Sequence, residues 1–102
     1  MSKELYSLVL SPENNCIFVG GELTFSTVNE ILAKAEDLFK SITDWDIDLA
    51  EVGRSDSAGL ALLVHWMRQA NMSNKKIVFH NIPQQMLAIA AASGLDELLP
   101  IQ

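Results

Sequence analysis

The interpretation of this sequence depends on one stretch that joins an alternating segment to a helical one, namely Asp48-Leu49-Ala50-Glu51-Val52-Gly53-Arg54-Ser55-Asp56-Ser57-Ala58-Gly59-Leu60. Residues 45–49 alternate between apolar and polar side chains, which predicts a strand. We expect a loop over residues 50–55 and then a helix that begins at Asp56 or Ser57 and ends near Met72. Taken alone, this pattern is also typical of any helix with a good N-cap.

The first turn of that helix combines three residues with distinct physical roles. The first N–H groups of a helix have no partners within it, and the side chain of Asp56 or Ser57 can accept hydrogen bonds from them. Gly59 has no side chain, so another backbone or a partner can approach closely. We expect Asp48 to accept hydrogen bonds from loop N–H groups near Asp56.

On either side of this stretch, the sequence predicts three further strands and two further helices. A turn at residues 11–15 separates two segments that resemble a hairpin. Thr27 and Glu30 match a capping box at the start of one helix, Pro83 suits the first position of another, and Gly94 suits its end. The strands are expected at Leu5–Leu10, Cys16–Val19 (ended by Gly20-Gly21) and Ile77–Phe79, and the helices from Thr27 to about Phe39 and from Pro83 to Ala92.

The resulting order is β-β-α-β-α-β-α, which indicates an α/β fold. Strand-helix-strand units imply parallel pairing with right-handed crossovers. The 102 residues fit one domain, 1–102, without a linker or repeat.

Composition restricts the possible functions. The formal charge of −6 and the single Lys75–Lys76 basic pair argue against binding to nucleic acid or to anionic lipid. No signal peptide is recognisable and no apolar run approaches the roughly 20 residues that cross a bilayer. With Cys16 as its one cysteine, the chain can form no internal disulfide. We therefore expect a cytoplasmic protein that reaches a membrane only through a partner.

A family resemblance follows from the same stretch. Asp48-Leu49 followed by Asp56-Ser57-Ala58-Gly59-Leu60 resembles the signature loop of STAS domains, the family of anti-sigma factor antagonists and sulfate-transporter tails, and residues 20–24 resemble the family's Gly-Glu-Leu segment. The resemblance covers nearly the whole chain and implies a small mixed sheet covered by helices on one side.

Within the family, residues 56–63 followed by His65 look most like the subgroup of Mla phospholipid ABC transporters. This similarity implies a subunit without catalytic activity, cofactor or small-molecule substrate. Its partner would be the cytoplasmic ATPase of a transporter that maintains outer-membrane lipid asymmetry. The alternative is a signalling STAS domain that antagonises an anti-sigma factor.

One departure from the family pattern separates these two functions. Antagonists with a phosphorylation switch resemble Asp-Ser-Ser-Gly, and the phosphorylated serine directly precedes the glycine. Ala58 stands at that position here and has no hydroxyl. Ser57 matches the hydroxyl position that the Mla subgroup carries and needs for function. A phosphate on Ser57 would still be compatible with a helix N-terminus.

Helical periodicity predicts a partner-binding face. Leu60, Leu63, Val64 and Met67 form the stripe that should face the sheet. The opposite side would then carry Leu62 and His65 outward, with Trp66 beside them or, alternatively, tucked into the core. We predict a docking surface made of Ser57, Ala58, Ala61, Leu62, His65 and Trp66.

Two other site chemistries receive little support from the sequence. His65 lacks a His or Cys one turn away, and metal sites normally use three or four ligands, so we expect no metal. Asp46 and Asp48 share one face of a strand and could form a catalytic carboxylate pair. No nucleophile or base accompanies them, and we expect Asp46 to be solvated.

Overall fold

The computed structural model describes residues 5–102 and confirms the expected order of elements. The elements are β1 (Tyr6–Ser11), β2 (Cys16–Leu23), α1 (Val28–Phe39), β3 (Asp44–Ser55), α2 (Ser57–Met72), β4 (Lys76–His80) and α3 (Gln84–Ala92). Within this range, none of the helices has the length and apolar composition needed to span a membrane.

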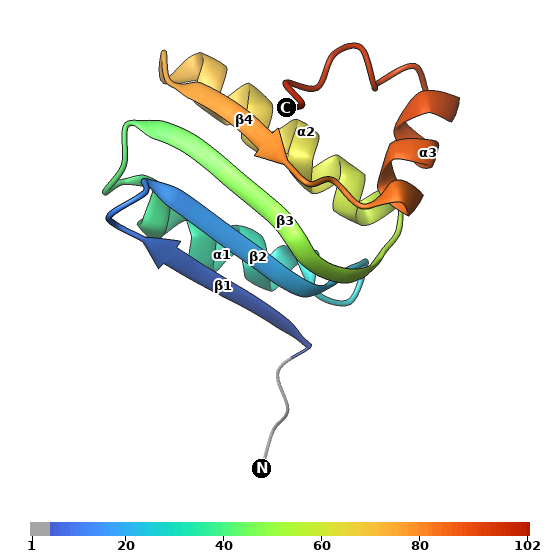
Figure 1. Ribbon diagram of the computed structural model, residues 1–102, viewed down its shortest axis with the longest axis horizontal. Coiled ribbons are helices and arrows are strands. Elements are labelled where there is room, and N and C mark those ends of the chain that lie inside the picture. Colours follow the sequence, from blue (N-terminus) through green and yellow to red (C-terminus); the bar gives the residue numbers. More distant parts are fainter. Residues whose placement is uncertain (1–4) are drawn as a thin grey trace.

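The four strands form one mixed sheet in the order β1-β2-β3-β4. β1 pairs antiparallel with β2, whereas β2/β3 and β3/β4 pair in parallel. Both crossovers advance in the same direction across the sheet, so their usual right-handed sense puts α1 and α2 on the same face. Figure 1 shows these two helices behind the sheet and α3 beyond its β4 side. The α/β fold expected from the order of elements and the mixed sheet implied by the resemblance are therefore confirmed.

β2 and β3 extend well beyond their expected ends, and the predicted loop over residues 50–55 is wrong. This segment continues β3 and pairs with the end of β2, with Gly20 opposite Glu51 and Leu23 opposite Ser55. Gly20 and Gly21 do not end β2; they lie at irregularities in the register. A Cβ on Gly20 would lie 2.6 Å from Ser7 Oγ, and Gly21 has φ +80°, so these glycines permit close packing and a bulge.

The predicted capping box at α1 is also wrong in its contacts, although the helix begins where expected. Thr27 is the N-cap residue but makes no side-chain cap bond. Its hydroxyl donates to the Glu22 carbonyl at 2.8 Å and accepts from the Thr24 N–H at 3.0 Å. The Oε1 atom of Glu30 lies 3.3 Å from Lys34 Nζ, in place of the hydrogen bond to the Thr27 N–H that a capping box requires. Thr27 therefore holds the turn before the helix.

The termini of α3 are close to the prediction. Pro83 lies one position before the helix, at the N-cap. Gly94 has φ +71°, and the Leu95 N–H donates to the Ala90 carbonyl at 2.8 Å. This hydrogen bond is typical of the Schellman motif, in which a residue in the left-handed conformation ends the helix.

The expected outward orientation of Leu62 is wrong, and Trp66 takes the alternative position in the core instead of a place on the docking surface. Leu62 is 4% exposed and Trp66 is 1% exposed. α2 packs against the sheet and against α1 at once, so its buried face is wider than the single stripe that was used to orient it. Trp66 meets Phe39 of α1 edge-on at 5.5 Å between ring centroids, and Phe39 stacks on Trp45 at 3.8 Å.

Truncation of Trp66 to alanine tests this buried position. Because loss of the large indole ring would leave a cavity between α1, α2 and β3, we expect Trp66→Ala to lower the free energy of unfolding by about 3–5 kcal/mol. Urea denaturation followed by circular dichroism measures the change. Met72→Ala is the control, since Met72 lies on the same helix and is exposed; equal, small effects of both variants would contradict the packing.

Candidate docking site at the start of α2

The carboxylate of Asp56 joins the first turn of α2 to the segment that precedes α1. Its Oδ1 accepts from the N–H groups of Ala58 at 2.9 Å and Gly59 at 3.4 Å. Its Oδ2 accepts from the Phe25 N–H at 3.2 Å. Of the two N-cap candidates the structure selects Asp56, and Ser57 is the first helical residue. One side chain thus positions two segments that are far apart in the sequence.

Gly59 allows this turn to lie directly on the end of β2. A Cβ at this position would be 2.4 Å from the carbonyl oxygen of Leu23 and 3.2 Å from the Cε of Met86. The expected close approach is therefore real, and the approaching backbone belongs to the chain itself. The Asp56 N–H donates to the same Leu23 carbonyl at 3.3 Å. Contacts within the chain already occupy this position, so a partner must bind beside it.

An apolar groove of about 270 Å³ lies between the first halves of α1 and α2. One side comes from the turn before α1 and from α1 itself, and the other side comes from α2. Phe25 stands at its rim with 83% of its surface exposed. The lining residues are Phe25, Val28, Asn29, Leu32, Ala58, Ala61, Leu62 and His65.

Four of the six predicted docking residues line this groove. Ala61 and His65 are exposed, Ala58 is half-buried, and Leu62 contributes to the wall although most of its surface is packed. Ser57 is exposed at the first position of α2. Trp66 does not line the groove and belongs to the core. Whether a partner binds these residues stays a prediction.

Sequence reasoning missed the half of the groove that comes from the α1 side. Phe25 lies in the turn before α1, and Val28 and Leu32 follow on that helix at i and i+4. An aromatic residue within a polar turn was the one available signal. Its proximity to Asp56 depends on the pairing of β2 with β3, which periodicity does not reveal.

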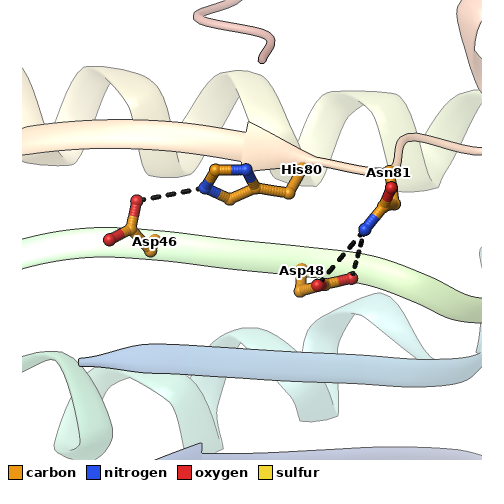
Figure 2. A network of polar contacts seen from close by, with 4 residues as sticks. All are labelled: Asp46, Asp48, His80 and Asn81. Carbon is orange, nitrogen blue, oxygen red and sulfur yellow. Dashed lines mark hydrogen bonds and ion pairs between the residues drawn. The ribbon is translucent and has the colours of Figure 1, made fainter. Parts of the chain in front are cut away.

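Asp48 does not belong to the docking site, and its predicted position near Asp56 is wrong. Because β3 continues to Ser55, eight residues at about 3.3 Å each separate the two aspartates by roughly 25 Å. Asp48 accepts from the Ala50 N–H at 2.9 Å and from the Asn81 amide at 3.2 Å. Figure 2 shows it with Asp46, His80 and Asn81 on the sheet face opposite the helices.

The sequence predicted a solvated Asp46. The structure instead gives this side chain a partner, because its Oδ1 lies 3.1 Å from His80 Nε2. The carboxylates of Asp46 and Asp48 thus have separate partners along the strand direction (Figure 2). Among residues 5–102, no group of three or more His, Cys, Asp or Glu side chains could hold a metal ion. This arrangement gives no support to a catalytic carboxylate pair.

Cys16 lies at the neighbouring position of the same face, opposite Asp46 in the β2–β3 ladder. Burial raises the pKa of its thiol, and the negative charges of Asp48 and Asp46 raise it further. A raised pKa leaves less thiolate at neutral pH, and the thiolate is the reactive form. The surroundings of Cys16 therefore favour the protonated thiol over the thiolate.

The sequence matches the family described as "Mlab, STAS domain" over residues 7–100. It is also 31% identical over 87 residues to the Haemophilus influenzae protein named "Intermembrane phospholipid transport system binding protein MlaB". That alignment covers 79% of this chain and 81% of the relative.

Solved structures show the same fold at lower sequence identity. The unphosphorylated anti-sigma factor antagonist SpoIIAA superposes with a TM-score of 0.70 at 20% identity, covering 95% of this chain and 87% of the other. A variant of RsbS from Moorella thermoacetica superposes with a TM-score of 0.69 at 14% identity, covering 97% and 86% of the two chains. These likenesses concern the fold.

The close packing of Gly59 generates a matched pair of substitutions. Since a Cβ would collide with the Leu23 carbonyl, we expect Gly59→Ala to lower the free energy of unfolding by about 1–3 kcal/mol. Gly53→Ala is the control, because a Cβ there meets nothing within 4 Å. Thermal and urea denaturation measure both; similar stabilities of the two variants would refute the packing argument.

The raised pKa of Cys16 predicts slow alkylation in the native protein. At neutral pH, iodoacetamide should modify Cys16 more slowly than in the urea-unfolded chain, and the rate should increase as the pH rises toward the thiol pKa. Asp48→Asn removes a negative charge that raises this pKa, so it should accelerate alkylation. Mass spectrometry measures the rate, and a rate unaffected by unfolding and by Asp48→Asn would contradict the assignment.

Proposed function

The chain belongs to the STAS domain family, and we propose that it is the STAS subunit of an Mla-type phospholipid ABC transporter, in which it binds the ATPase without chemistry of its own. The Haemophilus influenzae relative is named as a binding protein of an intermembrane phospholipid transport system. Its alignment covers most of both chains, which supports transfer of this role. The transporter would use this subunit to maintain outer-membrane lipid asymmetry.

The groove between α1 and α2 is the observation that carries the proposal. It is lined mainly by apolar side chains, and Phe25 projects from its rim with 83% exposure. An exposed aromatic residue next to a hollow is typical of an interface hot spot, where a partner side chain fills the hollow and covers the ring. The same surface includes Ala58, Ala61 and His65, which the sequence had suggested independently.

The small residues of α2 favour a helix or a flat surface of the ATPase as the docked element. Ala58 and Ala61 let a partner backbone come close, and Leu62 forms the wall beneath them. Ser57, the exposed residue before Ala58, supplies a hydroxyl that can donate or accept a hydrogen bond. The contact is thus apolar at its centre and polar at its edge, as in most protein interfaces.

Docking of this kind would stabilise or regulate the ATPase by mass action. A subunit that binds only the folded, assembled ATPase shifts the equilibrium toward that state. The chain would then be cytoplasmic and would lie beside the inner membrane through its partner. The formal charge of −6 agrees with recruitment by protein, because an anionic lipid surface attracts basic segments.

Antagonism of an anti-sigma factor is the second candidate, favoured by the structural likeness to SpoIIAA. Ala58 weighs against the phosphorylation switch of that class, because alanine cannot accept a phosphate at the position before Gly59. The two candidates predict different partners for the same groove. Co-purification from the native organism distinguishes an ATPase and permease from a kinase-like anti-sigma factor.

Truncation of the Phe25 ring tests the docking site without disturbing the core. We expect Phe25→Ala to weaken binding to the ATPase about 10- to 100-fold, because the ring is a hot-spot candidate at the rim of the groove. Isothermal titration calorimetry with the purified ATPase measures the dissociation constant. Unchanged affinity of the folded variant would exclude the groove as the docking site.

Two controls accompany this measurement. Met72→Ala removes an equally exposed apolar side chain (85%) at the other end of α2 and should leave affinity unchanged. Ala61→Glu places a charge in the groove and should also abolish tight binding, whereas Ala88→Glu on the exposed side of α3 should not. Leu62→Asp is unsuitable, since Leu62 is 4% exposed and a buried charge would unfold the domain.

A further inference from the structure

The outer edge of β1 differs from the opposite edge of the sheet. At the β4 edge, the C-terminal tail adds hydrogen bonds: the Phe79 N–H donates to the Pro100 carbonyl at 2.9 Å, and the Gln102 N–H donates to the Phe79 carbonyl at 2.9 Å. Within residues 5–102, no strand pairs with the outer side of β1. Exposed edges are usually protected by lysine, proline or a bulge. The β1 sequence Tyr-Ser-Leu-Val-Leu-Ser contains no charge and no proline, and its register is regular.

The backbone groups that β1 directs outward can be identified from its ladder with β2. In an antiparallel pair, opposed residues alternate between those that exchange hydrogen bonds and those that do not. The Glu22 N–H donates to the Leu5 carbonyl at 2.8 Å, so Leu5 and Glu22 form a bonded pair. The alternation then directs the backbone groups of Val9 toward β2 and those of Leu8 and Leu10 away from the sheet.

The sequence of this edge is a palindrome, so two antiparallel copies of it match residue by residue. Residues 7–11 read Ser-Leu-Val-Leu-Ser in both directions, with Val9 at the centre. If two copies pair antiparallel around a twofold axis at Val9, then Leu8 faces Leu10 and Ser7 faces Ser11. Leu8 and Leu10 are the residues with outward backbone groups, so each Leu8–Leu10 pair can exchange two hydrogen bonds. Every residue meets a side chain of the same type on the same face.

Exposed apolar surface along the edge fits the same arrangement. Val9 is 56% exposed, and Leu8 and Leu10 are half-buried. A hollow of about 540 Å³ runs beside β1 and is lined by Tyr6, Ser7, Leu8, Val9, Lys34 and Leu38. In the paired arrangement, the leucines of the second copy would extend the sheet over this hollow and cover Leu38. Association would therefore bury apolar surface as well as complete the ladder.

We propose that two copies of this chain associate through β1, so that two four-stranded sheets become one continuous sheet with a twofold axis at Val9. A closed twofold pairing satisfies both edges at once, which limits growth to a dimer. At the β4 edge, the C-terminal tail already occupies the outward N–H and carbonyl groups of Phe79, which shortens the edge open to another strand. A second copy is favoured over a strand of another protein because the palindrome gives no advantage to an unrelated strand.

The contact is small for an interface between two proteins. A strand of six residues is about 20 Å long. With a depth of about 15 Å for the sheet and part of the helix layer, each copy would bury on the order of 300 Å², compared with about 800 Å² in a stable interface. We therefore expect a weak dimer with a dissociation constant on the order of 100 μM.

This contact is independent of the proposed docking groove. The groove uses Val28 and Leu32 of α1, whereas the hollow beside β1 uses Lys34 and Leu38 of the same helix. The two surfaces lie on different sides of α1. A dimer through β1 would leave both grooves accessible, and Ala61→Glu should abolish docking while leaving self-association unchanged.

Sedimentation equilibrium of the full chain between about 10 μM and about 1 mM tests the proposal directly. We expect a monomer–dimer equilibrium within this range. Amide hydrogen exchange by NMR should show protection of Leu8 and Leu10 that increases with protein concentration, whereas Val9 is protected at all concentrations by its bonds to β2. A chain that remains monomeric throughout this range, or Leu8 and Leu10 amides whose exchange is independent of concentration, would overturn the proposal.

Charge substitutions at Val9 test the register. Val9→Lys and Val9→Glu each place like charges face to face at the twofold axis, so each variant alone should dimerise about tenfold more weakly. An equimolar mixture should recover association at least as strong as that of the unmodified chain. Val78→Lys is the control for added charge, because Val78 lies on the same sheet face in β4, away from β1. Undiminished dimers of the single variants, or no recovery in the mixture, would exclude pairing about Val9.

Discussion

The hydrogen bonds of the Asp56 carboxylate hold together the part of the molecule on which the proposed function depends. They connect the first turn of α2 to the backbone of Phe25, 31 residues earlier in the chain. The absence of a side chain at Gly59 lets the same turn rest on the end of β2. This junction fixes the start of α2 against the turn before α1, and so it helps to shape the groove between the two helices.

The two faces of the sheet have different roles because the crossovers place both helices on one side. The covered face carries the apolar core, in which Trp66, Phe39 and Trp45 contact one another between the layers. The open face carries short polar pairs such as Asp46–His80 and Asp48–Asn81 (Figure 2). These pairs satisfy the exposed side of the strands and do not converge on a cavity, so the surface available to a partner lies at the helix starts and at the β1 edge.

Several elements could be predicted from residues close together in the chain. Asp56, Ser57 and Gly59 identify the start of α2, and Ala58, Ala61 and His65 were correctly assigned to the surface. The helix-angle argument was wrong for Leu62, and it left the position of Trp66 open, because it assumed one buried stripe facing the sheet. A helix that also packs beside a second helix buries a wider arc, and a single-helix pattern contains no information about that neighbour.

Local patterns in the sequence were enough to predict the order of strands and helices, the family resemblance and the capped start of α2, because each pattern involves residues that are close together in the chain. Tertiary structure alone decided that residues 50–55 extend β3, that Asp48 lies far from Asp56, and that Phe25 stands beside the α2 groove. These features arise from pairing between β2 and β3, whose partners are about 30 residues apart. Backbone pairing over that separation is selected by the packing of the whole sheet, and local side-chain patterns do not encode it.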